Sequence, residues 1–422
     1  MSKSVSFLGF PSFFARLVFC SLSFCGDVVV VGVVVGKIIV GVGALVLSLW
    51  GAIEWQYRRR PGNALAMTAG KWNLEVYQPQ HYHLTGELEL VNQTRRLEIM
   101  VPELSAEVTL LSKGSLDAVT HTLTLTPNHA DAEARADGYW FGYIVKVGKS
   151  TGLTVTLDIT GPHLNQLQAA WIRVRYVTYG PEGRVPKMRH VVVPLKFPAV
   201  DAEQRWRPTP EADLLPIPTH LLSHLDTPSE VVRRYVLPHA QPGDIVAIAE
   251  TPVALMQERF RHPSEVQPGW LARRICYFFL PTSSLATACG MQSLVDVVGP
   301  WRVGMAFLVG AIAKKFLNKP GVFYQLAGDQ ARLIDDVTGT LPPYDQFIVL
   351  GPEDPQTVVN DIQRETGISA AIVDVNDLRA VKVLAATADV SLPMLENALI
   401  TNPAGNADEQ TPIVLIRPTV KG

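Results

Sequence analysis

Three aspartates in the second half of the chain have the chemistry and the placement of metal ligands. Asp335 and Asp336 are adjacent and lie shortly before a Thr-Gly turn, and Asp374 lies near the end of the apolar run ISAAIVDV. Such a run is typical of a buried strand, and carboxylates at strand ends are hard oxygen ligands for Mg²⁺ or Mn²⁺. Asp335, Asp336 and Asp374 are therefore compatible with a divalent-metal site. Capping of a turn and of a strand end is the alternative.

Arginines are the candidate partners for an anionic cofactor. Arg259 and Arg261 lie at the end of a predicted helix over 251–260. Nucleotide phosphates bind to basic side chains or to a glycine-rich loop, and no Gly-x-x-x-x-Gly-Lys sequence occurs in this chain. We therefore take Arg259 and Arg261 as the cofactor-binding candidates, with solvated surface arginines as the alternative.

The cysteines show no zinc-binding pattern, because the four of them form no Cys-x-x-Cys pair. His220 and His224 have His-x-x-x-His spacing, without a pair of cysteines beside them. His81 and His83 share one face of a predicted strand, which is compatible with a metal pair. We interpret them instead as two polar residues near a strand edge.

The composition excludes several classes of protein. Hydrophobic residues make up 47% of the 422 residues and charged residues 18%, which is incompatible with bulk disorder. The formal net charge is -2, so no basic field favours nucleic acid, and we expect no nucleic-acid partner.

The apolar residues are concentrated near the N-terminus, where residues 28–53 carry Lys37 as their only charge. About 20 apolar residues cross a bilayer as a helix, so we predict a transmembrane helix over 27–57. Arg58, Arg59 and Arg60 follow it and place the C-terminal part in the cytoplasm by the positive-inside rule. A cleaved signal peptide and a buried helix are the alternatives. The apolar extension 1–26 leaves open a second crossing, and hence a hairpin rather than a single pass.

The middle of the chain, residues 72–198, reads as short alternating runs that end in Gly, Pro or Asn. This pattern predicts an antiparallel β-sandwich of about eight strands. Residues 199–217 are rich in proline and predict an extended linker. Residues 218–422 mix helices and apolar strands, as in an α/β domain. Within them, the apolar stretch 301–316 predicts a buried core helix rather than a membrane contact.

The C-terminal region also resembles a known family. The stretches that carry the resemblance are THLLSHLDTPSEVVRRYVLPHAQPGDIVAIAETPVALMQERF (219–260), LAGDQARLIDDVTGTLP (326–342) and VLGPEDPQTVVNDIQRETGISAAIVDVNDL (349–378). They are similar to the coenzyme F(420)-0:gamma-glutamyl ligase family, and more narrowly to its membrane-anchored cyanobacterial-type members. The family holds a divalent metal with aspartates. The resemblance matches one of them to Asp335 or Asp336 and another to Asp374.

The resemblance implies an α+β protein made of a transmembrane helix, an antiparallel β-sandwich and a gamma-glutamyl-ligase-like domain. It implies GTP with Mg²⁺ or Mn²⁺ as cofactors, L-glutamate and a small-molecule acceptor as substrates, and a homodimer. The family carries a lysine-rich motif where this chain has residues 251–258, which contain no lysine. Two hypotheses follow: a membrane-anchored amide-bond-forming ligase, or an inactive scaffold or binding module with a ligase fold.

Overall fold

The structure is a computed structural model, and it describes residues 27–58, 62–199, 206–336, 341–375, 380–405 and 409–419, without the side chains of residues 27–39, 57, 58 and 336. The predicted extension 1–26 therefore lies outside the described residues. The chain divides into two compact units, Met1–Pro61 and Gly62–Gly422.

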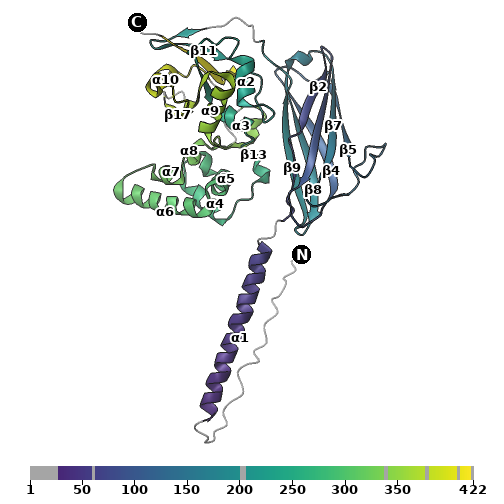
Figure 1. Cartoon of the computed structure of the whole chain (residues 1–422), viewed down its shortest axis with the longest axis vertical. Coiled ribbons are helices and arrows are strands. Elements are labelled where there is room, and N and C mark those ends of the chain that lie inside the picture. The colour runs from purple at the N-terminus through teal and green to yellow at the C-terminus, as the bar shows by residue number, and fades with distance from the viewer. Residues whose placement is uncertain are drawn as a thin grey trace, which may run out of the picture. The chain divides into compact units, whose positions relative to one another are not determined.

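The first unit contains helix α1, Asp27–Arg58, in the segment where the sequence predicts a transmembrane helix (Figure 1). Most of its described side chains are exposed and apolar, among them Leu47, Trp50 and Ile53. Among the described residues, no single helix is both long and apolar enough to cross a membrane. Helices α5 (Ala288–Val298) and α6 (Pro300–Leu317) meet that test only as a pair bent by 114°.

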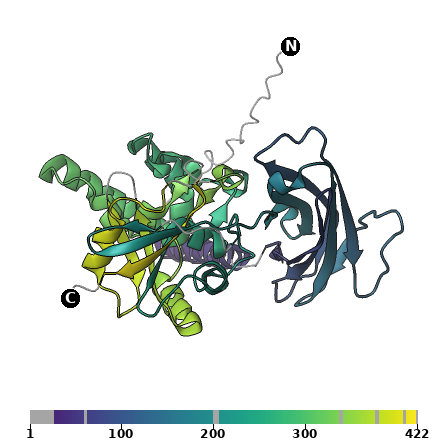
Figure 2. The ribbon, with the colours of Figure 1, turned by 90° about the horizontal axis from the view of Figure 1, so that it is seen from above.

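The second unit begins with a sandwich of two antiparallel sheets, which confirms the predicted antiparallel strands (Figures 1 and 2). One sheet has the order β1-β3-β7-β5 with β2 paired to β3, and the other has the order β6-β4-β8-β9. The strands are β1 Leu65–Met67, β2 Lys71–Gln78, β3 His81–Asn92, β4 Ile99–Ser112, β5 Thr120–Asn128, β6 Tyr143–Val145, β7 Ser150–Thr160, β8 Leu167–Gly180 and β9 Gly183–Pro194. The short helix η1, Leu164–Gln166, precedes β8.

Alternation in the sequence explains how each sandwich strand is oriented. In β7 every second residue is buried, and the buried set includes Val155, Leu157 and Ile159. These side chains pack against inward residues of β3 and β8 in one apolar core. The polar residues between them, such as Asp158, therefore face outward.

A six-stranded mixed sheet forms the centre of the C-terminal domain, in the order β10-β11-β18-β12-β16-β17. Strands β12 and β16 run parallel, and the other neighbours are antiparallel. Its strands are β10 Arg207–Pro208, β11 Ala212–Ile217, β12 Ile245–Ala249, β16 Ser369–Val375, β17 Val381–Ala386 and β18 Ile413–Pro418. The predicted linker 199–217 thus contributes β10 and β11 to this sheet, because β11 buries Leu214, Leu215 and Ile217 in spite of its proline.

Helices cover both faces of this sheet. Val246 and Ile248 pack with α2 (Pro228–Tyr235), α3 (Glu250–Met256) and α9 (Pro355–Thr366). Ile245 and Ala247 point the other way and pack with α10 (Leu392–Leu399). A strand buried on both faces needs apolar side chains at every position, which explains the uninterrupted sequence IVAIA.

A small sheet and a helical layer lie between these elements in the chain. The small sheet has the order β13-β15-β14, from Phe260–Arg261, Ile348–Val349 and Asp335–Asp336. The remaining helical segments are η2 Pro263–Glu265, α4 Trp270–Ile275, η3 Cys276–Phe278, η4 Ser284–Ala286, α5, α6, α7 Val322–Ala327, α8 Gln330–Leu333 and η5 Tyr344–Gln346.

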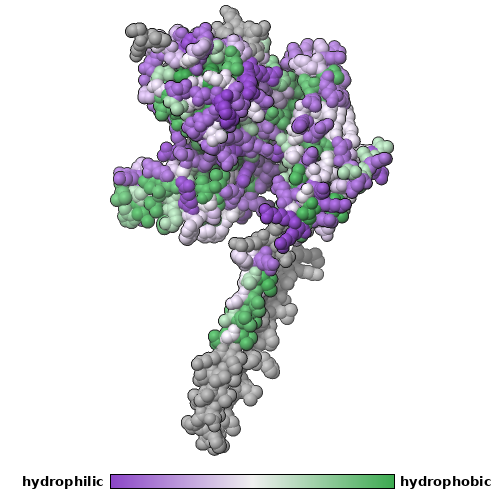
Figure 3. Space-filling model, viewed as in Figure 1, coloured by the Kyte–Doolittle hydropathy of each residue, from purple (hydrophilic) through white to green (hydrophobic). Residues whose placement is uncertain are grey.

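Helix α6 is not the buried core helix that the sequence predicts. It buries only small or medium side chains, at Val303, Ala306, Gly310 and Ala313, whereas Trp301 is 83% exposed and Phe316 is 73% exposed. Figure 3 shows the resulting hydrophobic surface over this helix. The prediction is wrong because an apolar composition does not say which side of a helix the protein covers.

Apolar contacts join the sandwich to the C-terminal domain within the second unit. Trp171 of β8 packs in one cluster with Tyr344 and Phe347, all nearly inaccessible to solvent. The ring of His190 stacks on Trp171 and on His262, and meets Phe347 edge to face. The two domains are therefore held together by a buried aromatic cluster.

Candidate functional site

Two carboxylates follow the parallel strands at the carboxyl edge of the central sheet. Ala249 at the end of β12 pairs with Val373 of β16. The next residue on each strand is acidic: Glu250, which begins α3, and Asp374. Parallel strands that are in register end at the same edge, so the two side chains belong to one site.

Asp335 joins this pair from the small sheet. It lies in β14 and pairs with Val349 of β15. Burial and the charge of Asp374 together raise the pKa of Asp335 to about 6. Asp336 follows in the same strand, and its side chain is outside the described residues. The structure therefore brings Asp335 and Asp374 together, as the metal-site prediction requires.

The electrostatics of the three carboxylates show that they share one environment. Burial raises the pKa of Glu250 to about 7, and the charges of Asp374 and then Asp335 add to the effect. Burial also raises the pKa of Asp374, and the charge of Lys382 opposes that rise. Desolvated like charges destabilise one another, and a bound cation relieves that repulsion.

The donor set fits a hard divalent cation. The carboxylate oxygens of Glu250, Asp335 and Asp374 do not all lie within 4.8 Å of one another. Mg²⁺ usually keeps several waters and takes one or two protein carboxylates together with substrate phosphates. A cation held here would therefore need water or phosphate oxygens to complete its shell.

Glu250 was not among the residues predicted from the sequence. It stands after the apolar run IVAIA in the same way that Asp374 stands after SAAIV. That symmetry is the signal that identifies it, but only the parallel pairing of β12 with β16 turns it into proximity.

The two predicted cofactor-binding arginines both have protein partners. Arg259 donates from Nε to the carbonyl oxygen of Gly351 at 2.6 Å and from Nη1 to Glu353 at 3.0 Å. Arg261 forms an ion pair with Asp296 at 2.6 Å. The structure thus gives both arginines contacts within the protein, and their role in cofactor binding stays a prediction.

Two other basic side chains lie near the carboxylates. Lys382 is opposite Asp374 in the β16–β17 pairing, and its Nζ lies 3.1 Å from Oδ1 of Asp329. Arg332 lines a cavity of about 430 Å³ that also includes Asp335, Ser283, Ser284 and Tyr324. This cavity adjoins the carboxylate site and offers hydroxyl, cationic and anionic groups to a polar ligand.

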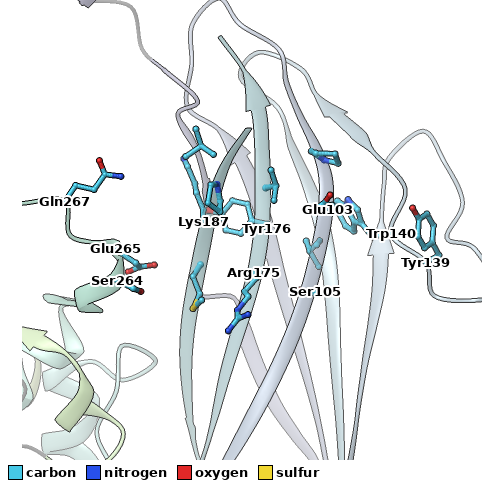
Figure 4. Close-up of a pocket in the computed structure, with 16 residues that line it drawn as sticks. Glu103, Ser105, Tyr139, Trp140, Arg175, Tyr176, Lys187, Ser264, Glu265 and Gln267 are labelled. Atoms are coloured by element: carbon cyan, nitrogen blue, oxygen red, sulfur yellow. The ribbon is translucent and has the colours of Figure 1, made fainter. Parts of the chain in front are cut away.

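A larger cavity, of about 980 Å³, lies between the sandwich and η2 (Figure 4). Its charged groups are largely engaged: Lys187 donates to the carbonyl oxygens of Asn63 and Leu65 at 2.7 and 2.8 Å, and Arg175 pairs with Glu107. Burial raises the pKa of Glu265, which lines the opposite wall. This cavity is the larger of the two, but the smaller one contains Asp335, whose pKa is raised by burial and by Asp374. We therefore take the smaller cavity as the candidate reaction site.

Comparison with known protein families gives a match for the sandwich. A family model described as "F420-0:gamma-glutamyl ligase, N-terminal Ig-like domain" matches residues 66–197. The sandwich is an Ig-like domain of the F420-0:gamma-glutamyl ligase family. This match confirms the family suspected from the sequence, and it does so on a part of the chain other than the motifs that carried the resemblance.

Solved structures similar to part of the chain are distant. The GAE domain of GGA2p from Saccharomyces cerevisiae is 8% identical, with a TM-score of 0.19, and the match covers 31% of this chain and 89% of that one. A FixG-related protein from Vibrio parahaemolyticus is 12% identical, with a TM-score of 0.15, and the match covers 31% and 97%. No curated protein sequence matches the chain.

Proposed function

We propose that the chain is a metal-dependent amide-bond-forming ligase of the F420-0:gamma-glutamyl ligase type, with its reaction centre at Glu250, Asp335 and Asp374. The observation that carries the proposal is that these carboxylates, from three separate elements, are all desolvated and that the charge of Asp374 raises the pKa of the other two. The Ig-like domain supports the family relationship. The reaction expected from that relationship joins L-glutamate to F420-0 with GTP as the energy source.

Each side chain has a separate role in this proposal. Glu250 and Asp374, at the edge of the central sheet, and Asp335, on β14, hold Mg²⁺ or Mn²⁺, which supplies charge neutralisation for a nucleotide. Lys382 and Arg332 are the nearest basic groups that the structure offers to phosphate oxygens. They replace the lysines that the family motif has in the segment corresponding to residues 251–258. Ser283 and Tyr324 line the adjoining cavity and orient a polar acceptor.

The membrane part of the proposal rests on α1. Its described residues expose many apolar side chains, including Trp50 and Trp55, and arginines stand at positions 58–60 of the sequence. We infer that α1 anchors the protein in a membrane, with the C-terminal domain on the cytoplasmic side. Protease protection of the full chain in sealed vesicles tests this: a protected C-terminal domain after insertion from the outside would contradict the orientation.

The decisive experiment titrates the full chain in detergent with Mn²⁺ and GTP by calorimetry, for the wild type, Asp374→Asn and the control Asp361→Asn. Asp361 lies on α9 and forms an ion pair with Arg364, so its replacement leaves the carboxylate site intact. The proposal expects Mn²⁺-dependent GTP binding that falls at least 10-fold in Asp374→Asn and is unchanged in Asp361→Asn.

The alternative function is a membrane-anchored scaffold that keeps the fold without turnover. The observation that favours it is the absence of lysine from residues 251–258. Wild-type protein that binds neither Mn²⁺ nor GTP would contradict the ligase proposal and leave this alternative. Binding followed by amide formation with labelled L-glutamate would exclude the scaffold.

A further inference from the structure

A second group of metal-ligand side chains lies on the outer face of the Ig-like domain. His83 of β3 pairs directly with Asp158 of β7, and His81 stands two residues before His83 on the same face. Oδ1 of Asp158 is 2.7 Å from Nδ1 of His83 and 3.2 Å from Nε2 of His81. All three ligand atoms lie within 4.8 Å of one another.

This geometry points to a transition-metal site, and we propose that His81, His83 and Asp158 bind a Zn²⁺-like cation with an open fourth position. Zn–N and Zn–O bonds of about 2.0–2.1 Å in a tetrahedron place neighbouring ligand atoms roughly 3.3 Å apart. The two distances to Asp158 are close to that spacing. Two imidazoles with one carboxylate are a donor set typical of Zn²⁺ and of its spectroscopic substitute Co²⁺.

Glu75 supplies the outer contact that metal-bound histidines usually have. It lies at the irregularity in the pairing of β2 with β3, beside His83. Its Oε2 is 3.6 Å from Nε2 of His83, the nitrogen that faces away from Asp158. A carboxylate there orients the ring and fixes Nδ1 as the ligand atom. The side chains of His81 and Asp158 are 40% and 41% exposed, so a cation reaches the site from solvent.

The test measures Co²⁺ binding by its visible absorption, followed by Zn²⁺ displacement, with the full chain in an Asp374→Asn background. That background separates the result from the carboxylate site of the proposed ligase. His83→Asn and Asp158→Asn each remove a ligand atom and are expected to weaken Co²⁺ binding by more than about 100-fold, beyond the loss that outer contacts cause. His121→Asn is the matched control, because His121 pairs with Ile159 and so lies on the other face of the sheet.

The outcomes are distinct. A tetrahedral cobalt spectrum that is lost in both ligand variants and kept in His121→Asn supports the site. Absence of Co²⁺ and Zn²⁺ binding in the background protein, or equal binding by His83→Asn, overturns it. Neither result bears on GTP binding at Glu250, Asp335 and Asp374.

An independent observation concerns the helical surface, defined here as the exposed apolar face of α4, η3 and α6. Its large side chains are Trp270, Tyr277, Phe278, Leu280, Trp301, Met305, Leu308, Ile312, Phe316 and Leu317. Soluble proteins rarely expose a patch of this kind unless it contacts a partner or a membrane.

The packing of α6 is inverted relative to a soluble helix. Its small residues Ala306, Gly310 and Ala313 face the protein, and a Cβ atom on Gly310 would lie 3.0 Å from the backbone nitrogen of Phe323. Large apolar side chains face outward. Small residues between packed helices and large residues outside are typical of helices in contact with lipid.

The charges of this surface favour an anionic bilayer as its occupant. Residues 270–327 contain six Lys and Arg residues and one Asp, in a chain whose net charge is -2. Arg274 lies 5.8 Å from the ring centre of Trp270, and Lys315 lies 5.6 Å from that of Phe316. Tryptophan beside basic residues is typical of segments that lie in the membrane interface. We propose that the helical surface docks onto anionic lipid.

Quenching by brominated lipids in reconstituted vesicles tests this docking for the full chain. Trp270→Tyr with Trp301→Tyr is expected to remove a large part of the quenched fluorescence in vesicles that contain phosphatidylglycerol. The control Trp206→Tyr, in which the lost indole packs on Arg417, leaves the quenched part unchanged. Arg274→Glu with Lys315→Glu is expected to reduce quenching in anionic vesicles.

Two results overturn the lipid proposal. One is a quenched fraction that the double tryptophan variant does not change, which would leave α1 as the sole source of quenching. The other is cross-linking between two copies through residues of α6 together with unquenched Trp301, which would assign the surface to a second copy of the chain.

Discussion

Acidification is expected to weaken the junction between the Ig-like and C-terminal domains through His190. This side chain is 6% exposed and stacks on Trp171. Burial is the main cause that lowers its pKa to about 3, and the charges of His262 and nearby arginines add to it. The Trp171 indole donates to Nδ1 of His190 at 3.3 Å, so protonation at Nδ1 would remove the acceptor of that bond.

The sign and size follow from the difference between folded and unfolded states. The folded pKa of His190, about 3, lies below the ordinary value of 6.5, so the unfolded state binds the proton first. The stabilisation by neutral His190 is complete above pH 6.5 and is lost as the pH falls from 6.5 towards 3. At about pH 5 the loss is roughly 2 kcal/mol, at 1.36 kcal/mol per pH unit.

The assay is denaturant unfolding of the full chain in detergent at pH 7.5 and pH 5, for the wild type, His190→Gln and the control His121→Gln. We expect the fall in unfolding free energy between the two pH values to be about 2 kcal/mol smaller in His190→Gln than in the wild type. His121→Gln is expected to behave as the wild type. Equal pH dependence in the wild type and His190→Gln would refute the reasoning, whatever the stability of the variant at neutral pH.

Three further predictions concern packing, charge and metal. Phe347→Ala is expected to lower the unfolding free energy by about 3–5 kcal/mol, because Phe347 is 1% exposed between the domains; a loss below about 1 kcal/mol in calorimetry would show that the cluster is not packed. Arg417→Met leaves the carboxylate of Asp244, which is 2% exposed, without its 2.8 Å partner and is expected to cost about 3–5 kcal/mol. The control Arg364→Met breaks an exposed ion pair with Asp361 and is expected to lower the unfolding free energy by under about 1 kcal/mol. If Arg364→Met and Arg417→Met lowered the thermal stability equally, the buried role of Asp244 would be contradicted. Mn²⁺ at about 100 times its dissociation constant stabilises the protein by about 2.7 kcal/mol, and Glu250→Gln is expected to abolish most of that gain in a thermal shift; an unchanged shift would remove Glu250 from the site.

Local sequence signals predicted several elements well. The stretch 354–367 has an aspartate and a proline at its start and a glycine at its end, and it forms α9, Pro355–Thr366, with Asp354 as N-cap and Gly367 as C-cap. Thr357 donates its backbone N–H to the Asp354 side chain at 3.4 Å. Strand alternation predicted the antiparallel sandwich for a related reason. Capping and alternation depend on neighbours within a few residues, so the sequence alone contains the information.

Signals that depend on distant partners were read less well. The segment Ala212–Ile217 contains a proline, and its place in the sheet depends on pairing with β18, about 200 residues away in the chain. His81 and His83 become a candidate metal site only together with Asp158, which the β3–β7 register places opposite His83. No periodicity near either segment reports such a partner.

The carboxylate site shows the same division between local and distant information. The sequence pointed to Asp335 and Asp374 because each stands at the end of an apolar or turn-forming segment. Glu250 has the same local signature, but the signature alone also fits the first turn of a helix, which Glu250 does begin. The parallel register of β12 with β16 decides between these interpretations, because it places Glu250 beside Asp374 at one edge of the sheet. Burial and the neighbouring carboxylates raise the pKa of Glu250 to about 7, so its ionised form is destabilised there. Capping explains this poorly, since an exposed cap needs no desolvation. Under the proposed function, a bound cation would offset the destabilisation.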